Sequence, residues 1–166
     1  MKTSILNQQK NHPIQIQTLK RLTDWLGGKL DSATAPDRWS EVTVVLVDDE
    51  GITRTNLEYF GKNRPTDVIS FRYDPVPGED NAWSGDLMVN VDRAVQVGPQ
   101  HRGIDYELAL YIAHGFDHLT GAEDDTDIKR NRMRATETAW LEEAGKEMIE
   151  GLYAGTDSAS SQAQRS

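Results

Sequence analysis

Apolar and polar residues follow two periodicities along the chain, and each periodicity predicts a kind of secondary structure. Residues 14–17 alternate apolar and polar side chains like a short strand, and residues 66–73 predict a second strand. Residues 42–47 form a β-branched run typical of strands that are buried on both faces. Residues 86–92 carry apolar side chains at alternate positions and predict a further strand, so four strands are available for one small sheet.

Helical spacing of apolar residues occurs between and after these strands. Residues 18–26 predict an amphipathic helix, residues 52–59 a short one, and residues 93–100 a helical start that ends near a Gly-Pro turn. Residues 106–119 are apolar around most of the helix, so we expect burial on most sides, and residues 126–152 predict a last, charged helix. The predicted fold class is α+β, with a small mixed four-stranded sheet packed with helices.

A chain of 166 residues, of which 37% are apolar, suits one domain with a sizeable core. We expect this domain to span residues 13–153. The polar, Gln- and Asn-rich residues 1–12 predict a flexible N-terminal extension, and residues 154–166 lack apolar side chains to bury, which predicts a disordered tail.

Neither a membrane span nor a signal peptide is predicted. No apolar run approaches the roughly 18 residues of a membrane helix, and the N-terminal segment is too polar for a signal sequence. The absence of cysteine removes disulfides and thiolate metal sites and fits a reducing compartment. We therefore expect a cytoplasmic protein.

Two of the four histidines, His114 and His118, lie four residues apart near the end of the buried helix. At 3.6 residues per turn these positions are roughly 40° apart, so both imidazoles can reach one metal ion. Gly121 can end the helix in a left-handed conformation and turn the chain back, so that Asp124 offers a third ligand. Three protein ligands with one open position are typical of catalytic zinc.

A histidine pair followed by glycine and a third ligand also occurs in metzincin proteases, whose signature is H-E-x-x-H-x-x-G-x-x-H. Their general base is the glutamate after the first histidine, and this chain has Gly115 there, which cannot transfer a proton. Asp117 lies within about 60° of His114 on the helical wheel and is a weak candidate for a substitute base or a ligand's hydrogen-bond partner. A metallopeptidase stays a disfavoured alternative.

Four segments carry a resemblance to a known family: residues 55–62 (TNLEYFGK), 65–71 (PTDVISF), 85–87 (GDL) and 114–124 (HGFDHLTGAED). In this order they resemble the YbeY family, bacterial endoribonucleases also called rRNA maturation factors. The resemblance implies a zincin-like fold and a single-strand-specific, metal-dependent endoribonuclease. It also implies action in ribosomal RNA processing, notably 3′-end maturation of 16S rRNA, and in ribosome quality control, with single-stranded rRNA and ribosomal particles as partners.

The family's usual site motif is H-G-x-L-H-L-x-G-Y-D-H, with zinc held by three histidines. Carried over by position, it implies His114, His118 and Asp124 as ligands of one Zn²⁺ per chain, with both histidines acting in catalysis through the metal. Asp124 replaces the usual histidine; a carboxylate is an ordinary zinc ligand, but its charge weakens the ion as a Lewis acid and opens the site to other divalent metals. Asp125 is adjacent, and the spacing favours Asp124.

A second departure concerns the residue after the tyrosine of the N-x-x-Y stretch. Many family members have an arginine there, thought to contact RNA, and this chain has Phe60. Lys62, Arg64 and Arg72 are RNA-binding candidates that can supply positive charge to a phosphodiester instead. Phe71 and Phe116 are aromatic candidates for base stacking, although apolar positions in a helix or strand belong more often to the core.

The acidic balance of the chain opposes an RNA-binding role. A net charge of −9 repels polyanions on average, although residues 62–72 carry three basic groups against one acid. A substrate presented by a ribosomal particle would not have to be gripped by the enzyme alone. A non-catalytic ribosome-assembly factor, with a structural or vestigial metal, stays a further alternative.

Overall fold

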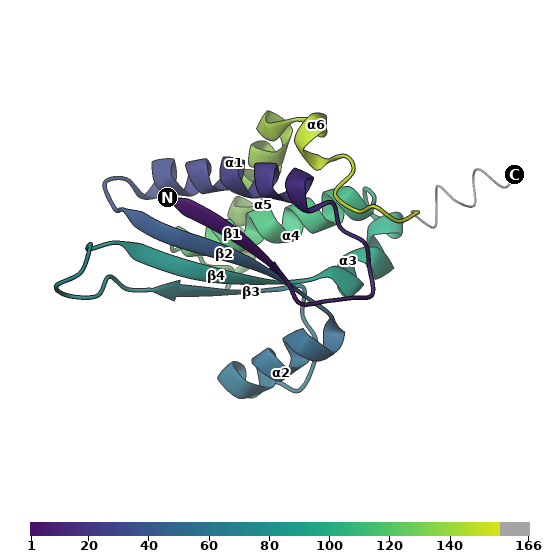
Figure 1. The fold of residues 1–166 in the computed structure, drawn as a ribbon, viewed down its shortest axis with the longest axis horizontal. Helices are drawn as coiled ribbons and strands as arrows, with labels where there is room; N and C mark the ends of the chain where they lie inside the picture. The colour runs from purple at the N-terminus through teal and green to yellow at the C-terminus, as the bar shows by residue number, and fades with distance from the viewer. Residues whose placement is uncertain (157–166) are drawn as a thin grey trace, which may run out of the picture.

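The computed structural model of the protein describes residues 1–156. Its elements follow in the order drawn in Figure 1: β1 (Lys2–Asn7), α1 (Ile16–Thr34), β2 (Trp39–Val47), α2 (Asp49–Phe60), β3 (Val68–Tyr73), β4 (Trp83–Asn90), α3 (Val91–Val97), the 3₁₀ turn η1 (Gly98–Gln100), α4 (Ile104–Leu119), α5 (Asp127–Ala144) and α6 (Lys146–Ile149). None of the helices in residues 1–156 is both long and apolar enough to span a membrane.

The four strands form one mixed sheet in the order β1-β2-β4-β3. β1, β2 and β4 run parallel, and β3 runs antiparallel to β4. This sheet, packed with helices, confirms the predicted α+β class. β3 is an edge strand, and no other strand in the described part of the chain pairs with its outer side.

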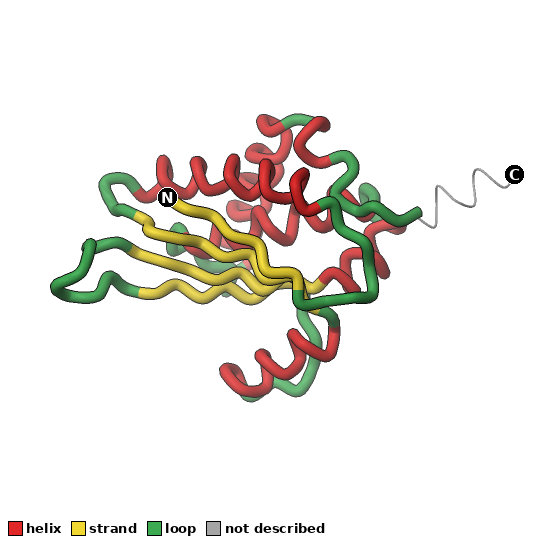
Figure 2. Tube along the Cα trace, in the orientation of Figure 1, coloured by secondary structure: helices red, strands yellow, loops and turns green. Residues whose placement is uncertain are grey.

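Most of the helices cover one face of the sheet, whereas α2 lies alone on the opposite face, as Figure 1 and Figure 2 show. Val42, Val44 and Leu46 of β2 are completely buried in the larger core. The residues between them are only partly buried, up to the end of the strand, where Val47 packs against Ile52 of α2. The prediction of burial on both faces therefore holds only at that end, because α2 covers only part of its face.

Helix α4 lies against the sheet and is the centre of the larger core. Twelve of its 16 residues are buried, which confirms the predicted burial on most sides. α1 and α5 also contact α4, and the apolar stripe of α1 is fully buried. A helix held by a sheet and by neighbouring helices is rigid, and its side chains are well suited to fix a site.

Two expectations for the N-terminal region are wrong. Residues 1–12 are not a flexible extension, because residues 2–7 form β1, which pairs with β2 and buries Thr3. Residues 14–17 are not a strand, since α1 begins at Ile16 and Ile14 forms only an isolated bridge with Tyr153. A short polar segment has little periodicity of its own, and here a partner strand far along the chain decides its conformation.

Several helix boundaries also differ from the prediction, since α1 continues to Thr34 and α2 begins at Asp49. α3 begins at Val91, because the Asn90 side chain caps it by accepting a hydrogen bond from the Arg93 N–H (3.3 Å). The last helix is interrupted at Gly145, whose φ is +86°, so α5 and α6 are separate helices. Of the tail expected over residues 154–166, residues 157–166 lie outside the described residues.

Candidate metal centre and nucleic-acid cleft

Helix α4 carries His114 and His118 close to its C-terminal end, where it packs tightly on β4. Gly115 allows this approach, because a Cβ atom there would lie 3.0 Å from the Leu87 side chain. A glutamate at this position, as in metzincins, would require the Leu87 side chain to shift. The absence of the peptidase base is thus tied to the way the helix sits on the sheet.

Three side chains converge at this end of α4, and we call His114, His118 and Asp124 the His/Asp group. The two Nε2 atoms are 3.0 Å apart, and Asp124 Oδ2 lies 3.7 Å from His114 Nε2 and 3.4 Å from His118 Nε2. Ligands of tetrahedral zinc, at bonds of about 2.0–2.1 Å, are about 3.3 Å apart. The three donor atoms therefore fit one divalent ion, and no further His, Asp or Glu of residues 1–156 joins the group.

The loop after α4 returns Asp124 to the histidines. Gly121 has φ = +97°, which favours glycine, and its N–H donates to the His118 carbonyl (3.0 Å) as the helix ends. The neighbouring Asp125 forms an ion pair with Lys129 (3.1 Å) and is not part of the His/Asp group. Asp124 is therefore the acid that faces the histidines, at the position that the spacing favoured.

Each imidazole is oriented through its other nitrogen. His114 Nδ1 lies 2.7 Å from Oε2 of Glu137 on α5, and His118 Nδ1 lies 3.1 Å from the carbonyl oxygen of Ala122. Because both partners are acceptors, each Nδ1 carries the proton and each Nε2 presents its lone pair. Two lone pairs and a carboxylate oxygen that face one another at such distances require a proton or a cation between them.

Sequence reasoning missed Glu137. Its side chain is 1% exposed, and it lies between the buried Met133 and Leu141, one helical turn to either side. A charged residue within the buried stripe of a helix needs a partner. That pattern was the available signal, although the sequence could not say that the partner would be His114.

Nearby carboxylates control the protonation of this centre. Burial alone lowers the pKa of His114, but the hydrogen bond and negative charge of Glu137 outweigh it, so the net shift is upward. Burial raises the pKa of Asp117 to about 7, and the hydrogen bond with Glu137 and the charge of Glu137 add to the rise. The excess of negative charge around the two imidazoles favours a bound cation.

The position of Asp117 does not favour a role as general base. The residue is 4% exposed, its buried Oδ2 atom has no hydrogen-bond partner among residues 1–156, and it does not line the cleft that reaches the His/Asp group. A base must reach its proton directly or through one water. Asp117 lies beside Glu137 and away from the cleft. Its role as a general base therefore stays a prediction without support from this geometry.

A cleft of about 610 Å³ extends from the His/Asp group and is lined by Lys62, Arg64 and Arg72; we call it the basic cleft. The structure thus brings all three predicted RNA-binding candidates to one surface with His118 and Asp124. The loop that carries the first two is fixed at both ends. Gly61 ends α2 with φ = +69°, and Asn56 Nδ2 donates to the Arg64 carbonyl (2.9 Å).

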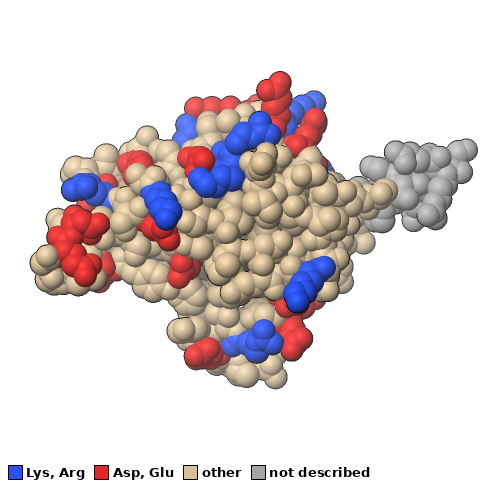
Figure 3. Space-filling model, in the orientation of Figure 1, with Lys and Arg blue, Asp and Glu red and all other residues tan. Residues whose placement is uncertain are grey.

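The cations of the basic cleft lie close together, and one of them also contacts an aromatic ring. On the face drawn in Figure 3, basic and acidic side chains alternate, and no extended basic surface is visible. Arg72 is held in place, because its guanidinium lies over the Trp83 ring at 4.9 Å from the centroid. The basic cleft therefore brings several cations together, the kind of surface that attracts a phosphate backbone.

The two aromatic candidates for base stacking are buried or partly buried. Phe116 is 0% exposed in the core, as is usual for an apolar helix position, so it is not available for stacking on a base. Phe71 is partly buried, with Tyr59 and Phe60 of α2 against its ring. Phe60, noted in the sequence only for the missing arginine, is the aromatic residue that lines the basic cleft.

Comparison with known proteins places this arrangement in a family. The model of the family described as Endoribonuclease YbeY matches residues 4–145. The chain belongs to the endoribonuclease YbeY family. The resemblance inferred from the sequence is thereby confirmed.

The matches between this chain and several curated YbeY relatives span nearly the whole length of those relatives. The endoribonuclease YbeY of Geobacter sulfurreducens is 35% identical over an alignment of 158 residues that covers 87% of this chain and 99% of the relative. That of Moorella thermoacetica is 33% identical over an alignment of 154 residues that covers 87% of this chain and 98% of the relative. A Thermotoga maritima protein known from a solution structure matches with a TM-score of 0.57 over 85% of this chain and 87% of its own, and at 23% identity this likeness concerns the fold alone.

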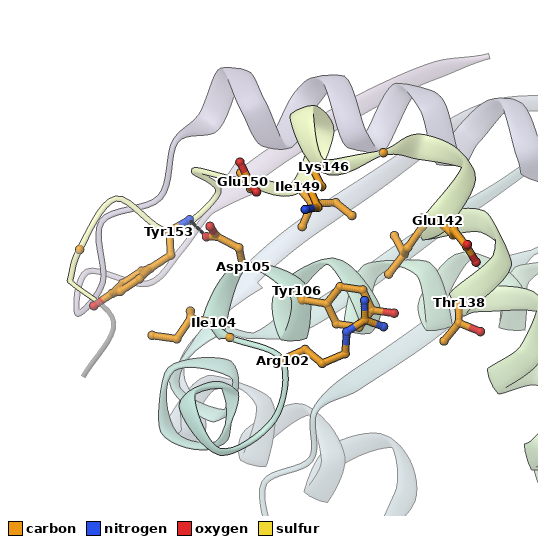
Figure 4. A pocket seen from close by; sticks show the side chains of 14 residues that line it. Arg102, Ile104, Asp105, Tyr106, Thr138, Glu142, Lys146, Ile149, Glu150 and Tyr153 are labelled. Atoms are coloured by element: carbon orange, nitrogen blue, oxygen red, sulfur yellow. Dashed lines mark hydrogen bonds between the residues drawn. The ribbon is translucent and has the colours of Figure 1, made fainter. Parts of the chain in front are cut away.

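A second cavity, of about 700 Å³, lies at the start of α4 and contains neither histidine of the YbeY motif. Figure 4 shows Arg102 beside Tyr106, with its guanidinium 3.8 Å from the ring centroid. Asp105 accepts hydrogen bonds from the N–H groups of Gly151 and Tyr153 (2.8 Å each) and so ties the C-terminal segment to α4. Charges of both signs line this cavity, which gives no preference for one class of ligand.

Proposed function

We propose that this chain is a metal-dependent endoribonuclease that cuts single-stranded RNA in ribosomal RNA processing. The observation that carries the proposal is the convergence of two Nε2 atoms and one carboxylate oxygen within 3.0–3.7 Å, at one end of a cleft lined by three cations. Membership of the endoribonuclease YbeY family supports the same reaction. Within this function we include 3′-end maturation of 16S rRNA and ribosome quality control.

The metal we propose is one Zn²⁺ per chain, held by His114, His118 and Asp124. A divalent cation there supplies positive charge to the phosphodiester and lowers the pKa of water. Glu137 fixes the tautomer and direction of His114, and the Ala122 carbonyl does the same for His118. Because one ligand is a carboxylate, another divalent ion is also compatible with the site.

The substrate is held by side chains of the chain itself. Lys62, Arg64 and Arg72 attract the phosphate backbone into the basic cleft and orient it toward the His/Asp group. No residue of the cleft is assigned as general base. If the RNA 2′-hydroxyl attacks, the products carry a cyclic phosphate, and if water attacks, they do not, so the product ends distinguish the two routes.

The partners we propose are single-stranded rRNA and ribosomal particles, and the location is the cytoplasm. A net charge of −9 disfavours tight binding of free RNA, and presentation of the strand by a particle compensates for it. This hypothesis predicts faster cleavage of precursor rRNA in small-subunit particles than of the same RNA free in solution. Equal rates at equal RNA concentration would refute it.

The two alternatives have less support. A metallopeptidase lacks the glutamate beside the first histidine, and Gly115 is packed against Leu87 at that position. A non-catalytic assembly factor requires no cleavage, so the same measurement that tests the nuclease tests it too.

The deciding experiment measures metal and activity on the same untagged samples. Metal content by elemental mass spectrometry and cleavage of single-stranded RNA are compared for wild type, His118→Ala and His12→Ala, the last as a control because His12 pairs with Asp92 outside the His/Asp group. About one zinc per chain, lost together with cleavage only in His118→Ala, supports the proposal. Metal without cleavage in wild type favours the assembly factor, and no metal in any sample overturns the site.

A further inference from the structure

An exposed aromatic ring forms part of the wall of the basic cleft. Phe60 is the last residue of α2, lines the cleft and is 52% exposed. Tyr59, its neighbour, is 62% exposed but does not line the cleft. A large apolar side chain exposed in a cleft often marks a contact surface, and the pair provides a test residue with a matched control.

The position of the Phe60 ring is fixed from behind. It packs nearly parallel to Phe71, with an interplanar angle of 13° and 6.2 Å between centroids, while Tyr59 meets Phe71 edge-on at 5.0 Å. Gly61 ends the helix directly after Phe60 in the left-handed conformation. Since the ring is already held in place, a flat ligand that stacks on it loses little additional side-chain entropy.

The surroundings of Phe60 suit a nucleotide. Lys62, Arg64 and Arg72 line the same cleft, and their charges match phosphates, whereas the ring matches the face of a base. A purely apolar ligand would leave three cations unpaired, and inorganic phosphate would leave the ring without a contact. Alternation of a charged backbone and flat bases is a property of single-stranded nucleic acid.

We propose that Phe60 is a stacking platform for one nucleobase of the single-stranded RNA that lies in the basic cleft. This inference rests on the proposed nuclease function and specifies how that site selects its substrate. The bases of a duplex are stacked on their neighbours, so only an unpaired nucleotide can present its face to Phe60. Because every base has such a face, the contact selects for unpaired structure and tolerates different sequences.

The test combines two changes, one in the protein and one in the RNA. Short single-stranded oligonucleotides, each with one abasic position, are cleaved by wild type, Phe60→Leu, Phe60→Trp and Tyr59→Leu. Loss of one stacked base weakens binding by roughly tenfold. We expect one abasic position to raise KM of wild type by about that factor, and Phe60→Leu to show the same rise on intact RNA with no further effect of that abasic position.

The other variants and a binding assay complete the test. Phe60→Trp keeps a flat ring and is expected to retain wild-type KM, and Tyr59→Leu is expected to behave like wild type. In parallel, an oligonucleotide with 2-aminopurine at the sensitive position is titrated into metal-free protein, where stacking quenches its fluorescence in wild type but not in Phe60→Leu.

Each outcome decides the proposal. If Phe60→Leu keeps the wild-type response to the abasic series and quenches 2-aminopurine as wild type does, the stacking role is overturned while RNA cleavage leaves the proposed function intact. If wild type does not cut RNA but Phe60-dependent quenching persists, the nuclease function fails and the base-binding site stands. Should Phe60→Leu not fold, Phe60→Trp and the abasic series on wild type still decide, because an abasic series without any sensitive position refutes stacking.

Discussion

Replacing Glu137 by glutamine isolates the electrostatic part of its contact with His114. The carboxylate is 1% exposed and its Oε2 lies 2.7 Å from Nδ1, so the hydrogen bond is both charged and shielded from water. Charged hydrogen bonds contribute about 1.5–3 kcal/mol and neutral ones about 0.5–1.5 kcal/mol. Glutamine keeps an acceptor and loses the charge, which corresponds to about 1–1.5 kcal/mol and roughly tenfold weaker zinc binding.

The assay is competition for zinc against a chromophoric chelator, with Glu137→Gln, Glu137→Ala and Glu142→Gln as the series. Alanine removes the acceptor altogether, and loss of such a partner typically lowers metal affinity by about 10–100-fold. Glu142 is an exposed residue of α5 outside the His/Asp group, so its substitution by glutamine is expected to leave zinc affinity unchanged. The expected order of affinity is Glu142→Gln, then Glu137→Gln, then Glu137→Ala.

One result would refute this reasoning. If Glu137→Gln and Glu137→Ala bind zinc as tightly as wild type, the hydrogen bond does not orient His114 for a metal. Thermal unfolding of the metal-free proteins separates this outcome from misfolding. A variant that unfolds cooperatively and still loses affinity has lost the orientation of the ligand and has kept the fold.

Three further predictions follow from the same centre. Gly115→Ala is expected to lower the free energy of unfolding by about 1–3 kcal/mol in urea titrations, because its Cβ would lie 3.0 Å from a β4 side chain. Gly28→Ala is the control and is not expected to lower it, since a Cβ there meets no atom within 4 Å; equal stabilities of the two variants would contradict the close packing. Asp124→Asn is expected to weaken zinc binding and Asp125→Asn to leave it unchanged in the same competition assay; the reverse order would assign the other acid. The pKa of Asp117 is raised from 3.8 to about 7 in the folded protein, so its contribution to stability is present below about pH 4 and lost as pH rises through 7. The free energy of unfolding of metal-free wild type is expected to fall by about 1.4 kcal/mol per pH unit in this range relative to Asp117→Asn. Parallel profiles for the two proteins would show that the pKa shift is absent.

The periodicity of apolar residues predicted the interiors of helices and strands but not their boundaries. The long apolar run of α4 and the β-branched run of β2 are specified by their own side chains, which is why both appear where expected. β1 is different, because most of its residues are polar and its pairing partner β2 lies far along the chain. α3 similarly begins earlier than predicted because a single capping side chain, Asn90, ends the strand and starts the helix.

The candidate site shows the same division between local and distant information. His114, His118 and Asp124 lie within eleven residues, so helix geometry and one turn were sufficient to predict that they meet. Glu137 reaches the same centre from another helix, and no local spacing relates it to His114. Likewise, no signal in the sequence indicated that Phe60 lines a cleft, since only tertiary packing decides which aromatic ring is exposed there.

The two departures from the family's usual motif act on one electrostatic balance. With a carboxylate ligand, a divalent ion in the His/Asp group retains a net charge of about +1 rather than +2, so it attracts a phosphodiester less strongly. Phe60 adds no charge where an arginine is usual, and the chain as a whole carries −9. In the proposed function the attraction for the backbone therefore depends on Lys62, Arg64 and Arg72, which line the same cleft as His118 and Asp124. A ring that stacks on a base then adds affinity that salt does not screen, which is the kind of contact that an acidic RNA-binding protein needs most.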